Sequence, residues 1–362
     1  MRSATTTEEP GCLRPDISGG GRPAALLGSA DFARLTDPFR PELLAYCYRM
    51  LGSLHDAEDQ LQEVLIRAWR SYGQFDGRAS LRTWLYRIAT NCCLRALENR
   101  SRRPLPAGLG GPSDPDGPLD QGGAEVRWLE PFPDVLLAAE STDPAAIVTS
   151  RQDMRLALIA ALQCLPGRQR SVLILRDVLM WRAAEVAELL GTSTVAVNSA
   201  LRRARAALRD ADPTRDEVRE PADAGQRTLV DQYAAAIENA DVAALMRLLR
   251  ADATFEMPPQ PAWFLGRHAI GRFLAVNVLR EPGDLRAVQT SANGQPALAI
   301  YLRDAVGGHR AHVVQVLRCT PAGVAHIVAF RTPDLFAAFG LPDRLPALPD
   351  AARRPARRRG RP

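Results

Sequence analysis

The stretch WRAAEVAELLGTSTVAVNSALRRARAALR, residues 181–209, predicts two short helices joined by a tight turn. Gly191 is expected to end the first helix, because glycine readily adopts the left-handed conformation found at helix C-termini. Ser193 can cap the second helix by accepting a hydrogen bond from a free backbone N–H group. Apolar residues recur at helical spacing in both segments. In the second segment they are Val197, Ala200, Leu201, Ala204 and Leu208.

The second of these helices has a strongly polar outer face. Short amide and hydroxyl side chains near its start, followed by arginines, suit a helix that lies in the major groove of DNA and bonds to base edges and phosphates. The turn spacing is typical of a helix-turn-helix. A solvated arginine face on an ordinary helical hairpin is the alternative. The outward residues are Asn198, Ser199, Arg202, Arg203, Arg205 and Arg209.

Length and composition set the scale of the molecule. A chain of 362 residues, 46% of them hydrophobic, is long enough for two or three globular domains. The formal net charge is +5, and all 46 basic residues are arginine. Arginine has GC-rich codons and lysine does not, so we attribute this bias to a GC-rich genome rather than to nucleic-acid binding.

The cysteines and the hydropathy of the chain exclude several classes of protein. The six cysteines form no Cys-x-x-Cys pair or Cys/His cluster, so we expect neither a metal site nor a cofactor. No signal peptide is evident, and no apolar run reaches the roughly 18 residues of a membrane span. We therefore expect a soluble, cytoplasmic protein that does not contact a membrane.

A predicted helix near the N-terminus, DAEDQLQEVLIRAWRSY (56–72), combines an apolar stripe with an acidic face. Acidic residues near a helix start are stabilised by the helix dipole, so the acidic face has a purely structural explanation. The alternative is a docking surface for a basic partner. The inward residues are Leu61, Val64, Leu65, Ala68 and Trp69, and the acidic face carries Asp56, Glu58, Asp59, Gln62 and Glu63.

The next predicted helix, LRTWLYRIATNCCLRALENRSRR (81–103), interleaves aromatic rings with arginines. Such a surface can bind single-stranded DNA, because rings stack on bases and guanidinium groups pair with phosphates. The alternative is that Trp84 and Tyr86 fill a helical core.

Together these helices resemble region 2 of a sigma-70 family factor of the extracytoplasmic-function group, and residues 181–209 resemble its region 4. The resemblance implies that the acidic helix docks on RNA polymerase core (its β and β′ subunits) through Asp56, Asp59, Gln62 and Glu63. It assigns capture of the −10 promoter element to Arg82, Trp84, Arg87 and Asn91, and reading of the −35 element to Asn198, Ser199, Arg202 and Arg203. Arg95 replaces an aspartate that the family pattern leads us to expect, which makes this face more basic.

Flanking segments divide the chain further. Residues 1–37 are expected to be a disordered leader or the product of a wrong start codon, and residues 38–103 to form region 2. Residues 104–142 are rich in glycine, proline and aspartate and are expected to be a linker. Within it, WLEPFPD (128–134) resembles a linker motif of sigma factors with a C-terminal extension, which implies a path along the polymerase. Its candidate docking residues are Trp128, Leu129 and Pro131.

The remainder predicts a second helical domain and an α+β domain. Residues 143–210 are expected to form the four-helix region 4, followed by a hinge at 211–225. Residues 226–341 show helices followed by four strands, and they resemble the SnoaL-like branch of the nuclear-transport-factor-2-like superfamily, which implies a cone with a ligand pocket. Residues 342–362 are expected to be a basic tail. Candidate pocket residues are Trp263, Phe264, His268, His309, His312 and Asp304.

The fold class expected is multidomain, with two all-α helical domains followed by an α+β SnoaL-like cone. We expect a sigma factor that directs bacterial RNA polymerase to −35/−10 promoters, is not itself an enzyme, and is modulated by the cone, with or without a small-molecule ligand. One alternative is a helix-turn-helix regulator that binds DNA without polymerase. Another is a SnoaL-like small-molecule enzyme with DNA-binding domains, using an Asp304/His309 or Asp304/His312 pair.

Overall fold

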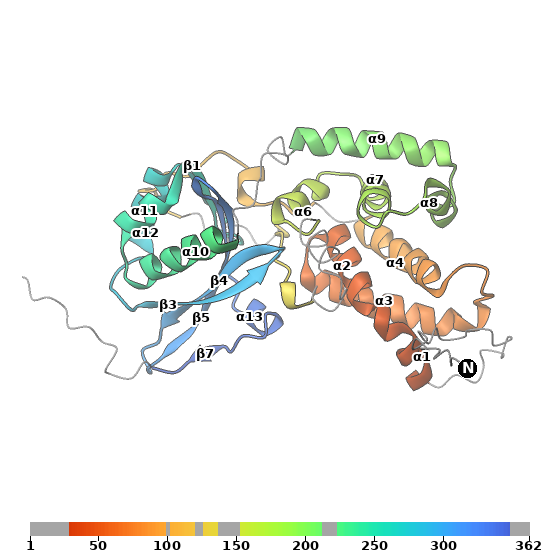
Figure 1. Ribbon diagram of the computed structural model, residues 1–362, viewed down its shortest axis with the longest axis horizontal. Helices are drawn as coiled ribbons and strands as arrows, with labels where there is room; N and C mark the ends of the chain where they lie inside the picture. The colour runs from red at the N-terminus through yellow and green to blue at the C-terminus, as the bar shows by residue number, and fades with distance from the viewer. Residues whose placement is uncertain (1–28, 99–101, 120–125, 137–152, 212–222, 348–362) are drawn as a thin grey trace, which may run out of the picture.

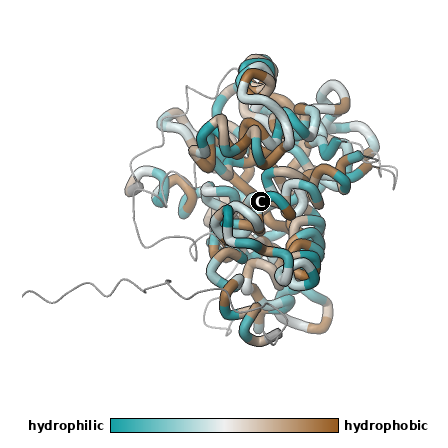
Figure 2. The backbone as a smooth tube through the Cα atoms, turned by 90° about the vertical axis from the view of Figure 1, so that its right-hand side faces the viewer, coloured by the Kyte–Doolittle hydropathy of each residue, from teal (hydrophilic) through white to brown (hydrophobic). Residues whose placement is uncertain are grey.

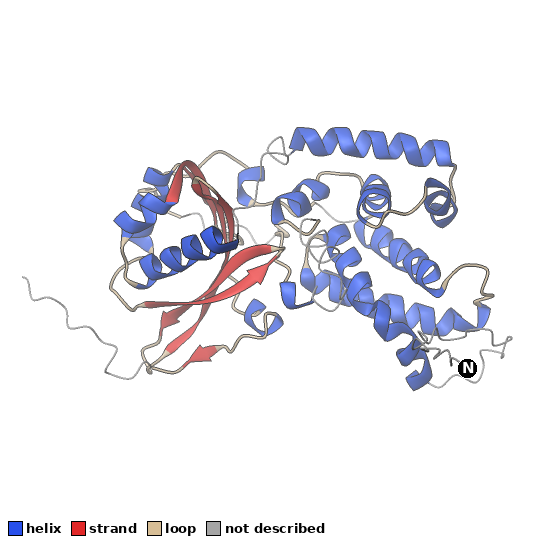
Figure 3. Ribbon diagram, viewed as in Figure 1, coloured by secondary structure: helices blue, strands red, loops and turns tan. Residues whose placement is uncertain are grey.

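The computed structural model describes residues 29–98, 102–119, 126–136, 153–211 and 223–347. Figure 1 shows a helical lobe, formed by α1 to α9, beside an α+β lobe that contains the sheet. Figure 3 shows that the strands all lie in the α+β lobe, which contains helices as well. The expected fold class, helical domains followed by an α+β cone, is confirmed.

The first helical unit is built around α2 (Arg40–Leu51), which is buried along most of its length. Serine side chains at the starts of α3 (Leu54–Ser71) and α4 (Leu81–Leu97) accept hydrogen bonds from backbone N–H groups, which fixes where both helices begin. Gly52 ends α2 with a φ of 72°, the left-handed conformation that favours glycine.

Two details of this unit differ from the sequence-based expectations. Ordered structure begins before residue 38, because α1 (Ser29–Thr36) and the short 3-10 helix Asp37–Phe39 precede α2, and Phe32 is buried in the core. The predicted leader is therefore too long at its C-terminal end, and residues 1–28 lie outside the described part. Trp69, predicted to face inward, is 52% exposed because the buried stripe of α3 runs through Leu61, Val64 and Ala68.

The second helical unit contains α6 (Leu156–Gln163), α7 (Gly167–Leu173), a π-helical turn (Ile174–Val178), α8 (Ala183–Leu190) and α9 (Thr194–Ala211). Its core face on α9 follows the predicted spacing: Val197, Leu201, Ala204 and Leu208 are all buried. This domain was expected from residue 143, and its first described helix begins at Leu156, after a turn. Residues 143–152 lie outside the described part.

The α+β lobe pairs three helices with one curved sheet. The helices are α10 (Asp223–Glu238), α11 (Val242–Leu248) and α12 (Arg267–Asn277). The strand order is β2-β1-β6-β5-β4-β3, in which β1 and β6 are parallel and the other pairs antiparallel; β7 pairs with β5. The bounds are β1 Leu249–Glu256, β2 Trp263–Leu265, β3 Leu285–Ala292, β4 Gln295–Arg303, β5 His309–Thr320, β6 Gly323–Phe330 and β7 Arg344–Leu345, with the short helix α13 at Leu335–Ala338.

Both faces of this sheet are apolar. The inner face packs against α10, α11 and α12, with residues such as Leu298, Ile300 and Leu317 in that core. The outer face belongs to the other core, which continues through the helical units and includes Val314 and Phe330. The sheet therefore lies between two hydrophobic layers, and its outer layer joins the two lobes.

Segments between the domains are part of this packing. Residues 102–119 pass from the helical lobe, where Arg103 pairs with Asp56, to the α+β lobe, where Ala107 and Ser113 form hydrogen bonds. Residues 126–136 lie between the lobes, with Leu129 and Phe132 fully buried. The expected linker is therefore not a free tether in these two described stretches.

Hydrophobic and hydrophilic residues alternate along the helices in Figure 2. Among the described residues, no helix combines the length and the apolar character needed to cross a bilayer.

Candidate nucleic-acid and polymerase interfaces

The outer face of α9 is positioned by the turn that precedes it. Gly191 has a φ of 60°, and the Ser193 hydroxyl accepts a hydrogen bond from the backbone N–H of Ala196 at 3.2 Å, as the sequence predicted. Asn198, Arg202 and Arg203 are exposed on the helix. Because the opposite face of the helix is buried, these side chains project into solvent from a rigid support.

Arg209, further along the same face, is also exposed, whereas two other polar positions are less available. Ser199 is half-buried. Arg205 pairs with Asp177 through two hydrogen bonds of 2.8 and 2.6 Å. That pair connects α9 to the π-helical turn, so Arg205 has a structural role in this conformation.

The basic helix α4 is partly occupied by contacts within the protein. Arg82 forms a bidentate pair with Glu42, at 2.9 and 2.7 Å, and its guanidinium lies 5.0 Å from the ring centre of Tyr86. Trp84 is half-buried against Phe75, with ring centres 5.1 Å apart. Contacts within the protein therefore occupy much of the side chains of Arg82 and Trp84.

The other two predicted −10 residues are exposed. Asn91 faces solvent, and Arg87 lies 3.6 Å from Glu188 of α8. An exposed pair at this distance is weak, on the order of 0–1 kcal/mol, so Arg87 can exchange its partner for a phosphate.

The acidic face of α3 likewise contains residues that are paired within the protein and residues that are exposed. Asp56 is largely buried and pairs with Arg103 at 2.5 Å, and Glu63 pairs with Arg67 on its own helix at 2.5 Å. Asp59 and Gln62 are exposed. Two of the four predicted polymerase contacts are thus open, while Asp56 fastens the segment that follows α4.

Residues 128–134 are held by α2 and its neighbours. The Tyr48 hydroxyl donates to the carbonyl of Glu130 at 2.8 Å, and the Ser53 hydroxyl donates to its carboxylate at 2.8 Å. Leu129 and Pro131 are buried, while Trp128 is half-buried. The sequence predicted that this apolar segment docks, and it docks on the protein itself rather than extending outward.

One residue joins four parts of the chain. Asn293, fully buried in the β3–β4 turn, accepts a hydrogen bond from the N–H of Phe132 at 2.9 Å and donates to the Tyr48 hydroxyl at 2.9 Å and the Met154 carbonyl at 2.8 Å. Its φ of 57° is one that asparagine tolerates. Asn-Gly is a typical hairpin-turn dipeptide, but nothing in the sequence around it indicates that this turn reaches the helical lobe.

The α+β lobe holds a cavity of about 560 Å³ on the inner face of its sheet. Of the candidate pocket residues, His312 and Asp304 line it, whereas the His309 ring N–H donates to the Gly283 carbonyl at 2.9 Å and lies elsewhere. Trp263 also lies outside the lining and instead bonds to the linker, its indole N–H donating to Gly110 at 2.9 Å. Phe264, fully buried, and His268, exposed, are likewise absent from that lining.

A β-bulge aims His312 into this cavity. On β5, Val313 pairs with Ile300 and Ala311 with Tyr301, so His312 is an extra residue in the strand. Such a bulge breaks the alternation of side chains. His312 therefore faces the cavity together with its neighbour Val313. Burial, with a smaller contribution from Arg331, lowers the pKa of His312 to about 4.

A carboxylate–histidine pair that the sequence did not reveal holds the linker. Buried Glu256 on β1 lies 2.7 Å from the His326 ring nitrogen, and its other oxygen accepts from the N–H of Ala107 at 2.8 Å. The neighbouring Phe255 and Met257 line the cavity, so Glu256 points to the opposite face of its strand. Within the described residues, no group of histidine, cysteine and acidic side chains has the geometry of a metal site.

The helical lobe matches two family models: residues 35–103 match Sigma-70 region 2, and residues 155–208 match Sigma-70, region 4. The geometry and these matches define the class as sigma-70 factors. The chain belongs to the extracytoplasmic-function (ECF) RNA polymerase sigma factors, being 51% identical over 328 residues to ECF RNA polymerase sigma factor SigG of Mycobacterium tuberculosis (strain ATCC 25618 / H37Rv). That alignment covers 90% of this chain and 88% of the relative.

A second relative from the same strain shares the whole architecture. ECF RNA polymerase sigma factor SigJ is 28% identical over 327 residues, which cover 85% of this chain and 94% of SigJ. The crystal structure of SigJ from Mycobacterium tuberculosis superposes with a TM-score of 0.57 at 26% identity, covering 86% of this chain and 99% of that one. The likeness therefore includes the α+β lobe.

Proposed function

We propose that this chain brings RNA polymerase core to promoters by reading a −35 element with α9 and capturing a −10 element with α4. The observation that carries the proposal is that one chain has two separate exposed polar surfaces. One is the arginine–asparagine face of α9, and the other is formed by Asp59 and Gln62 on α3. The core enzyme, through its β and β′ subunits, adds nucleotides, and this chain acts beside it in the cytoplasm.

We further infer that the described conformation is closed with respect to DNA. Trp181, between α7 and α8, packs on Tyr86 of α4 with ring centres 5.2 Å apart, and the guanidinium of Arg82 lies 5.8 Å from the same indole ring. The −10 residues thus contact the −35 unit. Engaging two separated promoter elements requires these units to part.

The junction contains a feature that favours its opening. Arg170 of α7 is buried and bonds to the Met50 carbonyl at the end of α2 and to Gln163, which are neutral partners. Burial lowers the pKa of Arg170 to about 10, because a desolvated cation without a carboxylate partner is disfavoured. When the units separate, water hydrates this guanidinium. The favourable free energy of hydration offsets part of the free energy of packing that is lost.

The α+β lobe is proposed to set this equilibrium. Its outer face shares a core with the helical units, and Asn293 ties it to both of them. A change in the lobe can therefore reach Tyr48, Phe132 and Met154 directly. Asp304 pairs with Arg344 at 2.8 Å and His309 with Gly283, so this arrangement favours a regulatory role over an Asp/His enzyme.

In vitro transcription with core polymerase on a promoter library tests the proposal. The full chain should make the core initiate at a defined −35/−10 sequence. Asp59→Arg should reduce binding to core about tenfold, since it reverses an exposed charge on α3, while Glu281→Arg, an exposed acidic residue of the other lobe, serves as the matched control. Tight DNA binding without core, or no initiation with it, would favour a stand-alone regulator.

Deleting the α+β lobe is a blunter experiment. It exposes Phe132 and the apolar residues packed against the sheet, and so confounds regulation with stability. The point variant Asn293→Ala loosens the same contact without removing the lobe, and it should raise initiation at equal concentration of folded protein. Unchanged initiation would separate the lobe from promoter control.

A further inference from the structure

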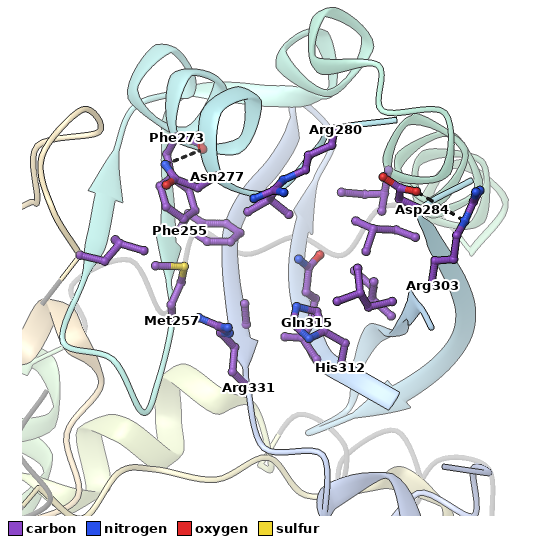
Figure 4. A pocket seen from close by; sticks show the side chains of 18 of the residues that line it. Phe255, Met257, Phe273, Asn277, Arg280, Asp284, Arg303, His312, Gln315 and Arg331 are labelled. Atoms are coloured by element: carbon purple, nitrogen blue, oxygen red, sulfur yellow. Dashed lines mark hydrogen bonds and ion pairs between the residues drawn. The ribbon is translucent and has the colours of Figure 1, made fainter. Parts of the chain in front are cut away.

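The cavity of the α+β lobe has the chemistry of a site for an amphipathic anion. Its walls are apolar, formed by residues from α12 and the inner face of the sheet, including Phe255, Met257, Phe273 and Ile300. A volume of about 560 Å³ is in the range of small-molecule sites. Figure 4 shows the aromatic rings and the sulfur of Met257 together on one side, with polar side chains on the others.

The charges around this cavity are unbalanced. Asp284 and Asp304 line it, but each is paired with an arginine: Asp284 with Arg303 at 3.4 Å and Asp304 with Arg344 at 2.8 Å. Arg331 donates to the neutral Gln260 side chain at 3.0 Å. Arg280 and Arg331 have no carboxylate partner among the described residues. Their two positive charges are therefore available to a bound anion.

Two neutral polar groups complete the site. The Gln315 side chain is buried, and its carbonyl accepts a hydrogen bond from the Tyr233 hydroxyl at 3.0 Å, which leaves its NH₂ group to face the cavity. His312 is aimed inward by the bulge. In Figure 4, Arg280 and Arg331 reach the cavity from two sides, with Gln315 and His312 on the strand between them.

A residue of the linker forms part of the same wall. Leu119 lines the cavity and packs against the core of the α+β lobe. The segment leading to it is fastened to the lobe at several points. Ala107 donates to Glu256 at 2.8 Å, Ser113 donates to the Trp263 carbonyl at 2.7 Å, and Arg272 pairs with Asp116.

We propose that this cavity binds an organic anion with a single apolar chain, and that the ligand displaces Leu119 and loosens the linker between the two DNA-reading units. The apolar chain of the ligand takes the place of Leu119 in the wall that Phe255 and Phe273 also form. Arg280 and Arg331 attract the anionic group of the ligand, such as a carboxylate. Binding is a property of the isolated chain. Its effect on transcription rests on the proposed function, so the two can fail separately.

Calorimetry on the full chain with decanoate tests the ligand class. Decanoate should bind at least about tenfold more tightly than decan-1-ol, which has the same chain without the charge. Arg280→Gln and Arg331→Gln should each weaken decanoate binding and leave decan-1-ol unaffected. Arg247→Gln, an exposed arginine of α11 outside the cavity, is the control. Equal binding of the two probes, or no binding of either, overturns the proposal.

Hydrogen exchange tests the role of Leu119. Saturating decanoate should speed amide exchange across residues 105–119, because the hydrogen bonds of Ala107 and Ser113 open. Leu119→Ala should bind decanoate about threefold more tightly or better, since the competing side chain is gone. Leu109→Ala, an exposed leucine of the same segment, should not. Unchanged exchange with decanoate bound, or unchanged affinity in Leu119→Ala, overturns the coupling.

Discussion

At the scale of single residues, the two lobes are joined by buried polar side chains that each form hydrogen bonds to several partners. Asn293 satisfies groups from α2, the linker and the turn before α6 with one amide. Glu256 does the same for Ala107 and His326. A buried polar group left without its partner costs about 1–3 kcal/mol, so such residues control how firmly the lobes are joined.

Asn293→Ala should lower the free energy of unfolding by at least about 2 kcal/mol. It leaves the Phe132 N–H and the Met154 carbonyl without their partner and places alanine at a positive φ. Urea denaturation measures the change. Asn239→Ala, which removes an exposed bond within a helix, should have an effect near zero. Equal losses in the two variants would contradict a joining role for Asn293.

His312 should make the protein less stable in acid. Its pKa is lowered to about 4 in the folded state, from an ordinary value of about 6.5, so the unfolded chain binds the proton more readily between these values. The free energy of unfolding should fall as pH drops from about 6.5 toward 4. At pH 4.5 this loss amounts to roughly 2 kcal/mol.

The comparison is between the wild type and His312→Gln, unfolded in urea at several pH values. In the variant, the free energy of unfolding should not show the decrease that His312 causes between about pH 6.5 and 4, and it should equal that of the wild type above pH 7. His55→Gln, an exposed histidine of α3, should retain the full slope. The same slope for wild type and His312→Gln would show that His312 is not the group responsible.

At the scale of elements, α9 and β5 show how a regular element carries function. On α9, burial of every third or fourth residue fixes the helix, so the exposed arginines point to solvent together. On β5, an irregularity in the strand, rather than its regular spacing, places a side chain in the cavity. A single bulge interrupts the alternation and gives the cavity a histidine that a regular strand would have turned away.

Arg202→Gln and Arg203→Gln should each weaken binding of the polymerase holoenzyme to a −35 duplex about fivefold or more. A bidentate arginine–base contact is worth about 1–3 kcal/mol. Fluorescence anisotropy with labelled DNA measures the loss. Arg205→Gln is the matched control on the same helix, because its side chain is held by Asp177. If Arg205→Gln lost as much affinity as the other two, the assigned reading face would be wrong.

At the scale of the whole molecule, the outer face of the sheet makes one core with the helical lobe. Opening the protein for DNA therefore separates surfaces that are packed like an interior. The Nε–H group of Arg170 and the indole N–H of Trp181 are buried in this packing without a hydrogen-bond partner among the described residues. They reduce the stability of the closed form.

Trp181→Ala should shift the chain toward an open form. It removes the ring contact with Tyr86 and the cation–π contact with Arg82. Small-angle scattering should give a larger radius of gyration, with the far-ultraviolet circular dichroism unchanged. Met180→Ala, at a neighbouring residue that is 77% exposed, should leave the radius as it is. Loss of helicity in Trp181→Ala would mean that the tryptophan stabilises its own unit instead.

The sequence by itself determined the parts of this protein. Periodic apolar residues identified the helices, and the signals at Gly191 and Ser193 marked where two of them end and begin. These features are local, because each depends on residues within a few positions of one another. The resemblance to sigma regions 2 and 4 rested on the same local patterns.

Only the tertiary structure decided which parts touch. The pairing of Asp56 with Arg103, the bonds of Asn293, the contact of Trp181 with Tyr86 and the place of Leu119 in the cavity all join residues far apart in the chain. Such contacts depend on how complete elements pack, and no short window of sequence encodes them. The exposed polar face of α9 could therefore be predicted from its own helix, whereas the cavity and the contact between the two helical units could not.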